Sequence, residues 1–315
     1  MDGSAAPTAL VLRALGLGDL LAGVPALRAV RRGLPGHHIV LAAPRGQATL
    51  LRGDRLVDAD HHAVGLEQLG WPGPPPDVAI DLHGRGPQSH RLLASLRPRR
   101  LIAFECAEAD VSGPTWVADE HERQRWCRLV SSCLGVTADA DDVALTPPAT
   151  PPPVTGAVVV HPGAAYPARR WHPDRFAEVA AALAGDGLRI VVTGGYADRS
   201  LATAVAAGAG LDGGAVLAGS TSLLQLAALV AAARLVVSGD TGVAHLAAAY
   251  GAPSVVLFGP TPPRLWGPPE GPHTVIWHGH DCPGDAWGAR IDPALAAIGV
   301  AEVVAAARNR LSSAR

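Results

Sequence analysis

Short runs of apolar residues alternate with longer helix-like stretches along the chain. The apolar run at 8–14 leads through a glycine turn, LGLGD, into a helical pattern at 20–32, and a second apolar run follows at 38–43. A strand, a turn, a helix and another strand in this order form the βαβ unit of a parallel sheet. The same rhythm predicts strands at 77–82, 101–104, 157–161, 189–193, 235–238 and 254–258, and helices at 121–135, 173–184, 223–232, 241–250 and 300–311.

A proline-rich segment, TPPATPPPVT at 146–155, interrupts this rhythm. Five prolines in ten residues favour a linker over a packed element. The pattern therefore predicts two Rossmann-like α/β domains, 1–150 and 151–315, that face each other across a cleft. Ligands of such sheets bind at the carboxyl ends of the strands. We expect the final helix to pack back on the first domain.

The composition excludes several classes of protein. The chain has 315 residues, of which 48% are hydrophobic and 17% charged, and its formal net charge of −2 lacks the basic footprint of a nucleic-acid binder. Its four cysteines form no CxxC pair, so we expect reduced thiols. The beginning of the chain is typical of a strand rather than a signal peptide, and the sequence contains no apolar run of the length that spans a membrane. These features favour a cytoplasmic protein.

The sharpest local signal is SGDTGVAHLAAAYGAP at 238–253. A buried strand runs into Asp240, Thr241 and Gly242, and a helix follows at once. The first amides of a helix have no internal partners and its dipole is positive there, so this end suits a diphosphate, with Val243 in the first turn and His245 one turn on. The alternative interpretation is plain N-capping by Asp240 or Thr241.

Two other turns carry candidate chemistry. HPGAAYPARRWHPDRF at 161–176 places Arg169 and Arg170 in a loop between a strand and a helix, where guanidinium groups pair well with phosphate. The alternative is that both arginines are solvated surface charges. Asp19 ends LGLGD at or near a helix N-terminus, either as a cap residue or as a carboxylate that faces the cleft.

Metal sites have weaker support. The strings DAD at 58–60 and DAD at 139–141 have the DxD form of a metal–diphosphate site, and HGHDC at 278–282 alternates histidine and cysteine as in a zinc site. The second DxD string lies in polar surroundings, and a fourth zinc ligand is not evident. We therefore expect no metal and no cofactor.

Taken together, these motifs resemble the heptosyltransferase family, glycosyltransferase family 9. The resemblance is carried by LGLGDLLAGVPALRAVRRGLPG, by VVVHPGAAYPARRWHPDRFAEVAAAL and most specifically by VVSGDTGVAHLAAAYGAPSVVLFGPTPPRLWGP. Weaker echoes such as DVAIDLHGR at 77–85 extend it along nearly the whole chain.

The resemblance implies an inverting, metal-independent transferase of the GT-B type. Its donor would be a nucleotide-diphospho-sugar, typically ADP-heptose, and its acceptor a lipopolysaccharide-type glycan or glycolipid. The resemblance implies these roles: a general base, Asp19; donor-site residues, Gly163, Arg169, Asp240, Thr241, Gly242, Val243 and His245; and acceptor-side residues, Gly18, His83 and Arg85.

The sequence also departs from the family's pattern. Arg169 stands where the family often has lysine, and Ala164 and Ala165 lack hydroxyl groups that some members use on the phosphate. These departures leave the donor sugar open. Two other functions remain: a nucleotide-sugar binder without catalysis, and a nucleotide-sugar epimerase.

The family implied by the resemblance works at the cytoplasmic face of the membrane. The arginines of the segment RLLASLRPRR are a candidate patch for an anionic acceptor or a membrane surface: Arg91, Arg97, Arg99 and Arg100. The alternative is a solvated helix end.

Overall fold

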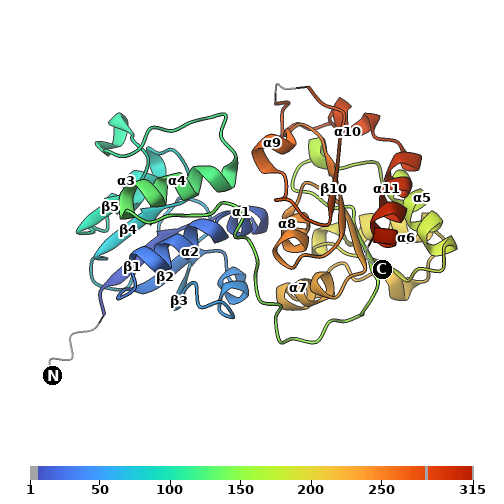
Figure 1. The fold of residues 1–315 in the computed structure, drawn as a ribbon, viewed down its shortest axis with the longest axis horizontal. Coiled ribbons are helices and arrows are strands. Elements are labelled where there is room, and N and C mark those ends of the chain that lie inside the picture. The colour runs from blue at the N-terminus through green and yellow to red at the C-terminus, as the bar shows by residue number, and fades with distance from the viewer. Residues whose placement is uncertain (1–5, 281–282, 314–315) are drawn as a thin grey trace. The chain divides into compact units, whose positions relative to one another are not determined.

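The computed structural model describes residues 6–280 and 283–313 and contains two compact units, Met1–Leu145 and Thr146–Arg315. Each unit contains one five-stranded parallel sheet with helices packed on it (Figure 1). The second unit begins at Thr146, which is the first residue of the proline-rich segment.

The first unit has the strand order β3-β2-β1-β4-β5. Its strands are β1 (Thr8–Leu12), β2 (His38–Ala43), β3 (Ala59–His62), β4 (Val78–Asp81) and β5 (Arg100–Ile102). Its helices are α1 (Leu17–Ala22), α2 (Val24–Gly33), α3 (Gln88–Ala94) and α4 (Glu122–Leu134), with short 3-10 turns at Gln47–Leu51 and Ala107–Ala109. Leu10 and Leu12 of β1 share a core cluster with Leu93 of α3. Because side chains alternate along a strand, Ala9 and Val11 face the opposite side of the sheet, where they are also fully buried.

The helix predicted at 20–32 is two helices, and it begins three residues earlier than the pattern indicates. Pro25 has no N–H, so a continuous helix would lack one bond in the middle of its ladder. The chain instead ends α1 at Ala22, followed by the C-cap residue Gly23, whose N–H donates to the carbonyls of Asp19 and Leu20, and starts α2 at Val24. As a result Asp19 lies in the first turn of a helix only six residues long.

The second unit has the strand order β10-β9-β8-β6-β7. Its strands are β6 (Val158–His161), β7 (Ile190–Val192), β8 (Leu235–Gly239), β9 (Ser254–Phe258) and β10 (His273–Trp277). Its helices are α5 (Pro173–Gly185), α6 (Arg199–Gly208), α7 (Leu223–Ala231), α8 (Gly242–Ala249), α9 (Pro263–Trp266), α10 (Pro293–Ala297) and α11 (Val300–Ser313), with 3-10 turns at Pro167–Arg169, Tyr196–Asp198 and Gly213–Ala215.

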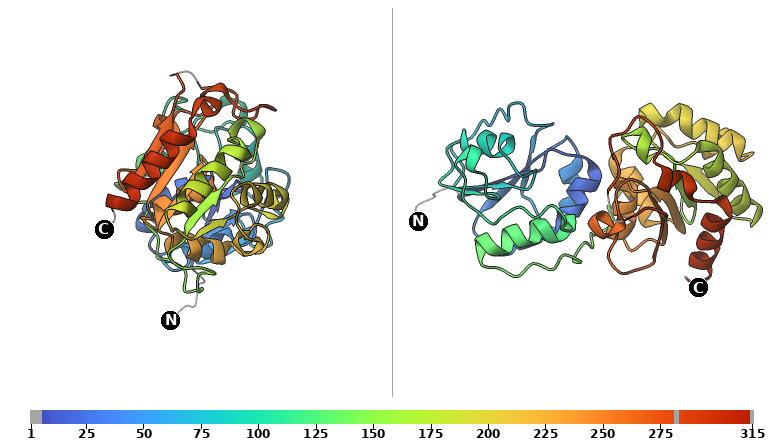
Figure 2. Two further views of the ribbon diagram at one scale, coloured as in Figure 1. Left: turned by 90° about the vertical axis from the view of Figure 1, so that its right-hand side faces the viewer. Right: turned by 90° about the horizontal axis from the view of Figure 1, so that it is seen from above.

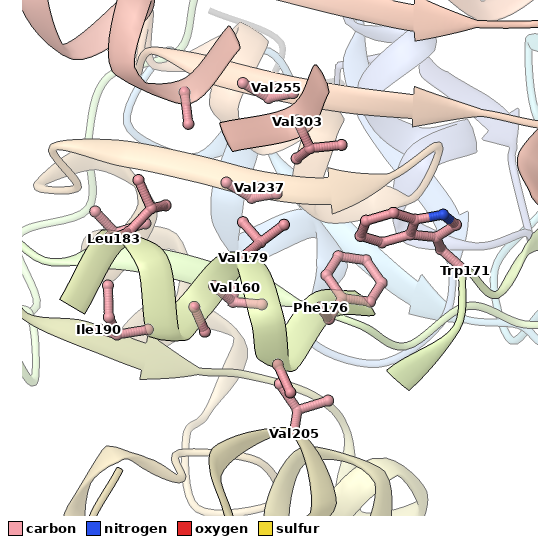
Figure 3. Close-up of a cluster of buried hydrophobic side chains, with 14 of the residues drawn as sticks. Val160, Trp171, Phe176, Val179, Leu183, Ile190, Val205, Val237, Val255 and Val303 are labelled. Atoms are coloured by element: carbon pink, nitrogen blue, oxygen red, sulfur yellow. The ribbon is translucent and has the colours of Figure 1, made fainter. Parts of the chain in front are cut away.

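Apolar side chains cover both faces of this sheet. On one face, Val160, Val237 and Val255 pack with aromatic and aliphatic residues from α5 and α11, as Figure 3 shows. On the other face, Ala244 of α8 packs with Phe258. A parallel sheet buried on both sides requires nearly continuous apolar strands, which is why these strands are visible in the sequence.

The final helix, α11, packs on α5 and on β8, β9 and β10 of its own unit, and Figure 2 shows it lying beside these strands. Its predicted packing on the first domain stays a prediction.

Several elements were not predicted from the sequence. They include β3, α3, α6 and β10. Both β3 and β10 are edge strands, and half of β3 is histidine, so neither has the continuous apolar run of a central strand.

Two histidines of the second unit make its stability depend on pH. Burial lowers the pKa of His161 to about 4, although the charge of Asp198 opposes the shift. Burial and the nearby charge of Arg310 lower the pKa of His273 to about 4 as well. Unfolded histidine has a pKa of about 6.5, so between these values the unfolded chain binds more protons than the folded one.

Above about pH 6.5 both histidines are neutral in the folded and the unfolded chain, and they cost no stability. We therefore expect the free energy of unfolding to fall as the pH drops from about 6.5 towards 4. Urea unfolding of wild type and His273→Gln at several pH values tests this, because the variant should lose part of the pH dependence. His172→Gln, at an exposed histidine of the same unit, is the matched control. If the free energy of unfolding changed equally with pH in wild type and His273→Gln, His273 would not have a lowered pKa in the folded protein.

Candidate functional site

The end of β8 and the start of α8 form an open helix N-terminus. Thr241 occupies the N-cap position with extended backbone, yet its side chain makes no capping hydrogen bond. Its hydroxyl oxygen is buried and has no hydrogen-bond partner among the described residues. The backbone amides of Gly242 and Val243 also donate to no backbone acceptor among the residues that the structure describes. One hydroxyl and two amides are therefore available to an anion here.

Asp240, directly before this end, is held firmly. It is 6% exposed, and Arg169 donates through Nη2 to its carboxylate at 3.0 Å and to its backbone carbonyl. Nε2 of His245 lies 3.9 Å from the other carboxylate oxygen, and the imidazole packs edge-on against Trp266. Asp240 thus joins the loop after β6 to the loop after β8 rather than capping α8.

Arg169 is less exposed than the sequence suggests for a loop arginine. Its side chain is 27% exposed, one terminal nitrogen is engaged with Asp240, and its Nε is buried without a hydrogen-bond partner among the described residues. The guanidinium therefore locks the loop and keeps a positive charge beside the start of α8. Its direct approach to a phosphate stays a prediction.

Gly163 lies in the buried start of the same loop. A β-carbon at this position would lie 2.8 Å from a carboxylate oxygen of Asp198, which itself accepts the N–H of Gly195 at 3.0 Å. A side chain at position 163 would push Asp198 out of this hydrogen bond, so glycine suits the packing here, whatever the loop binds. Neighbouring strand ends are polar too: Nδ1 of His161 lies 3.0 Å from the hydroxyl of Thr193.

In the first unit, Asp19 lies at the carboxyl end of the central strand. It follows β1, which pairs with β2 and β4 on its two sides. One carboxylate oxygen accepts the N–H of Gly16 at 3.2 Å, so Asp19 does help to cap α1, from the first turn. The other carboxylate oxygen has no partner among the described residues. Gly18 and Asp19 are both half-buried.

Arg13 also contributes to this site, and sequence reasoning missed it. Its side chain is 1% exposed, and its Nε donates to the backbone carbonyl of Asp19 at 2.8 Å. Nη1 donates to the carbonyl of Leu82, and Nη2 pairs with Glu122 at 3.1 Å. The only sequence signal is an arginine that directly follows a buried strand.

The loop after β4 is fixed by a buried ion pair. Asp81 accepts from Nδ1 of His90 at 2.8 Å, and Nε2 of His90 lies 2.8 Å from the carbonyl oxygen of Phe104. Both neighbours of the imidazole are acceptors, so His90 donates from both nitrogens and is charged. Burial lowers the pKa of His90, but the hydrogen bond and charge of Asp81 raise it above the ordinary value.

The predicted acceptor-side residues follow this ion pair directly. The N–H of His83 donates to Asp81 at 2.8 Å, and its Nδ1 is buried with no partner among the described residues. Burial lowers the pKa of His83, and the charge of Arg13 adds to this, although Asp81 and Asp19 oppose it. Arg85 is exposed.

The arginine patch is largely engaged with the protein. Arg91 donates to the carbonyl of Glu108, Arg99 pairs with Asp77 at 3.0 Å, and Arg100 donates to the carbonyl of Cys133. These contacts leave the groups less available to an anionic partner and favour the alternative interpretation, a solvated helix end. No helix within 6–280 and 283–313 is long and apolar enough to cross a membrane.

The candidate metal strings have other partners. Asp58 accepts from the amide of Ile39 and pairs with Arg31, and Asp141 pairs with Arg123 at 2.9 Å. His278 pairs with Glu302 at 2.8 Å, whereas Cys282 lies outside the described residues. Among the residues that the structure describes, no three histidine, cysteine or acidic side chains group as metal ligands.

Comparison with known proteins identifies the family. The sequence profile of glycosyltransferase family 9 (heptosyltransferase) matches residues 119–285, which is more than half of the chain. Lipopolysaccharide heptosyltransferase 2 of Salmonella typhimurium is 36% identical over 111 residues, which cover 34% of this chain and 32% of the relative. The match thus spans about a third of that relative's length.

Two solved structures share the fold along almost the whole chain. ADP-heptose lipopolysaccharide heptosyltransferase II of Escherichia coli has a TM-score of 0.79 at 22% identity, with 98% of this chain and 99% of that chain covered. The family 9 glycosyltransferase of Veillonella parvula has a TM-score of 0.78 at 19% identity, with 98% and 97% covered. The predicted GT-B class of α/β fold is confirmed. On the profile match, the chain belongs to glycosyltransferase family 9, the heptosyltransferase family.

Proposed function

We propose that this protein transfers a sugar, with inversion and without a metal, from a nucleotide-diphospho-sugar to a hydroxyl group of a cell-envelope glycan or glycolipid. The names of the relatives favour heptose as the sugar and ADP as the nucleotide. The observation that carries the proposal is the open start of α8, where the buried hydroxyl of Thr241 and two amides have no partners among the described residues.

The donor half of the reaction belongs to the second unit. A diphosphate at the start of α8 would receive hydrogen bonds from Thr241, Gly242 and Val243, and the charge of Arg169 lies beside it. Fixed donors and charges of this kind typically stabilise a developing negative charge by about 3–4 kcal/mol each, roughly 10²–10³ in rate. They would stabilise the nucleoside diphosphate as it leaves.

The acceptor half belongs to the first unit. Asp19 has one carboxylate oxygen engaged with Gly16 and one without a described partner, so it can accept a proton from a hydroxyl group that attacks the anomeric carbon. Two exposed arginines, Arg45 after β2 and Arg85 after β4, follow the strands on either side of β1. Neither pairs with an acidic side chain in the described ranges. They suit an acceptor that carries an anionic group.

Asp19→Asn tests the role of the base. We expect turnover to fall by about 10²–10⁴-fold because asparagine cannot accept the proton, while it can still accept the hydrogen bond from Gly16. Binding of the nucleotide-sugar should change by less than about twofold. ADP release with a lipopolysaccharide core fraction measures turnover, and a thermal-shift titration measures binding. More than about a tenth of wild-type activity in the variant would refute Asp19 as the base.

The same assay separates the other two functions. A scaffold would bind the nucleotide-sugar without releasing ADP to any envelope fraction. An epimerase would convert the donor without an acceptor, which chromatography of the nucleotide-sugar detects.

Gly242→Val tests the diphosphate site. A β-branched side chain at the first position of α8 would block close approach of the anion, so we expect ADP binding to weaken at least tenfold, about 1.4 kcal/mol. The thermal midpoint without ligand should stay near the wild-type value. Gly185→Val is the matched control, because a β-carbon at Gly185 meets no atom within 4 Å. Normal ADP binding by Gly242→Val would show that the diphosphate does not bind at the start of α8.

Treatment with EDTA tests metal independence. We expect turnover to change by less than about twofold, because Arg169 and the start of α8 supply the positive charge that a divalent cation would otherwise provide. A loss of activity that Mg²⁺ or Mn²⁺ restores would contradict this part of the proposal.

A further inference from the structure

We propose that Arg13 is a positioning residue for the transfer reaction: its guanidinium fixes helix α1, and with it Asp19, against the loop that follows β4. The proposal rests on the proposed role of Asp19 as the base. Arg13 itself need not touch substrate.

The guanidinium joins three segments that are distant in sequence. Nε donates to the carbonyl of Asp19 in α1, Nη1 to the carbonyl of Leu82 after β4, and Nη2 to the carboxylate of Glu122 in α4. The plane of the guanidinium also lies over the ring of Trp126, 4.9 Å from its centroid. A single rigid, fully buried group thus sets the distance between the carbonyl of Asp19 and the residue before His83.

The chain is built to accept a charge at this place. Glu122 is buried and is held from its other side by Arg125, while its first oxygen also accepts from Nε1 of Trp126 at 2.6 Å. Gly23 leaves room for the guanidinium, because a β-carbon there would lie 3.3 Å from Nε of Arg13. Burial of an ion costs several kcal/mol unless it is paired and hydrogen-bonded, and each of these contacts offsets that cost.

Helix α1 depends on this anchor more than a longer helix would. It has six residues and is capped by Gly23, and helices this short are marginal without tertiary contacts. The carboxylate of Asp19 is held within the described residues by one hydrogen bond, at 3.2 Å from the amide of Gly16. The position of the carboxylate therefore follows the backbone of α1, which Arg13 ties to the first sheet.

Lysine cannot replace this group. An ammonium is a point charge, whereas the guanidinium presents donors in a fixed planar fork and can reach two carbonyls and a carboxylate at once. Arg13→Lys keeps a positive charge beside Glu122 but breaks the connection between Asp19 and Leu82. We expect kcat to fall at least about tenfold and KM for ADP-heptose to change by less than about twofold, since the donor site belongs to the second unit.

The control is Arg123→Lys. Arg123, on α4, is another buried arginine of the first unit: it is 6% exposed, pairs with Asp141 and donates through Nε to the carbonyl of Ala140. Both variants are compared with wild type by ADP release from ADP-heptose with a lipopolysaccharide core fraction. Hydrogen exchange of the full chain without ligand is measured in parallel, and we expect faster exchange at 17–23 in Arg13→Lys alone.

The outcomes separate the two proposals. Equal kcat values for Arg13→Lys and Arg123→Lys, or faster exchange spread evenly over the first unit, would overturn the positioning role. A wild-type protein that transfers no sugar would contradict the proposed function instead. The exchange experiment would then decide by itself whether Arg13 fixes α1, because it needs no substrate. Should Arg13→Lys not fold, Arg13→Met, which keeps an unbranched apolar stem about as far as Nε and removes the charged fork, takes its place in both measurements.

Discussion

The parallel arrangement of the strands is the constraint on which the rest of this structure depends. In each five-stranded sheet all carboxyl ends lie at one edge, so loops that are far apart in sequence meet there. The loop after β6 reaches the loop after β8 in this way, and Arg169 bonds Asp240 across 71 residues of chain. Because both faces of the sheets are buried, the central strands are apolar along most of their length, and polar residues such as Asp81 and His161 stand at their carboxyl ends.

Two arginines connect the loops at these edges, and the positive charge of each is compensated differently. Arg13 is fully buried, and its charge is compensated by Glu122, by two backbone carbonyls and by the ring of Trp126. Arg169 keeps about a quarter of its side chain exposed and shares one carboxylate with His245. Removing one partner of a buried pair typically costs about 3–5 kcal/mol, so Arg13 is more tightly coupled to its surroundings than Arg169. A fully buried arginine such as Arg13 suits the positioning of other groups, whereas a partly exposed one such as Arg169 can still offer its charge to a ligand.

The sequence predicted the parts of the fold that depend on continuous apolar runs and on local signals. The central strands and the helix after Thr241 are of this kind. The edge strand β3, with the sequence ADHH, lacks such a run, and Pro25 broke a helix whose apolar pattern continues past it. The partners of Arg13 and His90 could not be predicted, since they lie up to 109 residues away in the chain and only the fold brings them together. For the same reason the sequence suggested Arg169 as a phosphate ligand without revealing its bond to Asp240.

The start of α8 departs from the usual rule of helix capping, and this departure is the local signal behind the proposed diphosphate site. Threonine at an N-cap normally accepts an amide of the first turn, and the loss of such a cap costs about 1 kcal/mol. Thr241 has the extended backbone of an N-cap but makes no such bond, and Asp240, the other candidate for this role, is turned to Arg169. Ser222 at the start of α7, by contrast, forms a complete capping box with Gln225. Within the described residues, the same unit thus caps α7 fully and leaves the first donors of α8 without partners, which is the arrangement that the proposed diphosphate site requires.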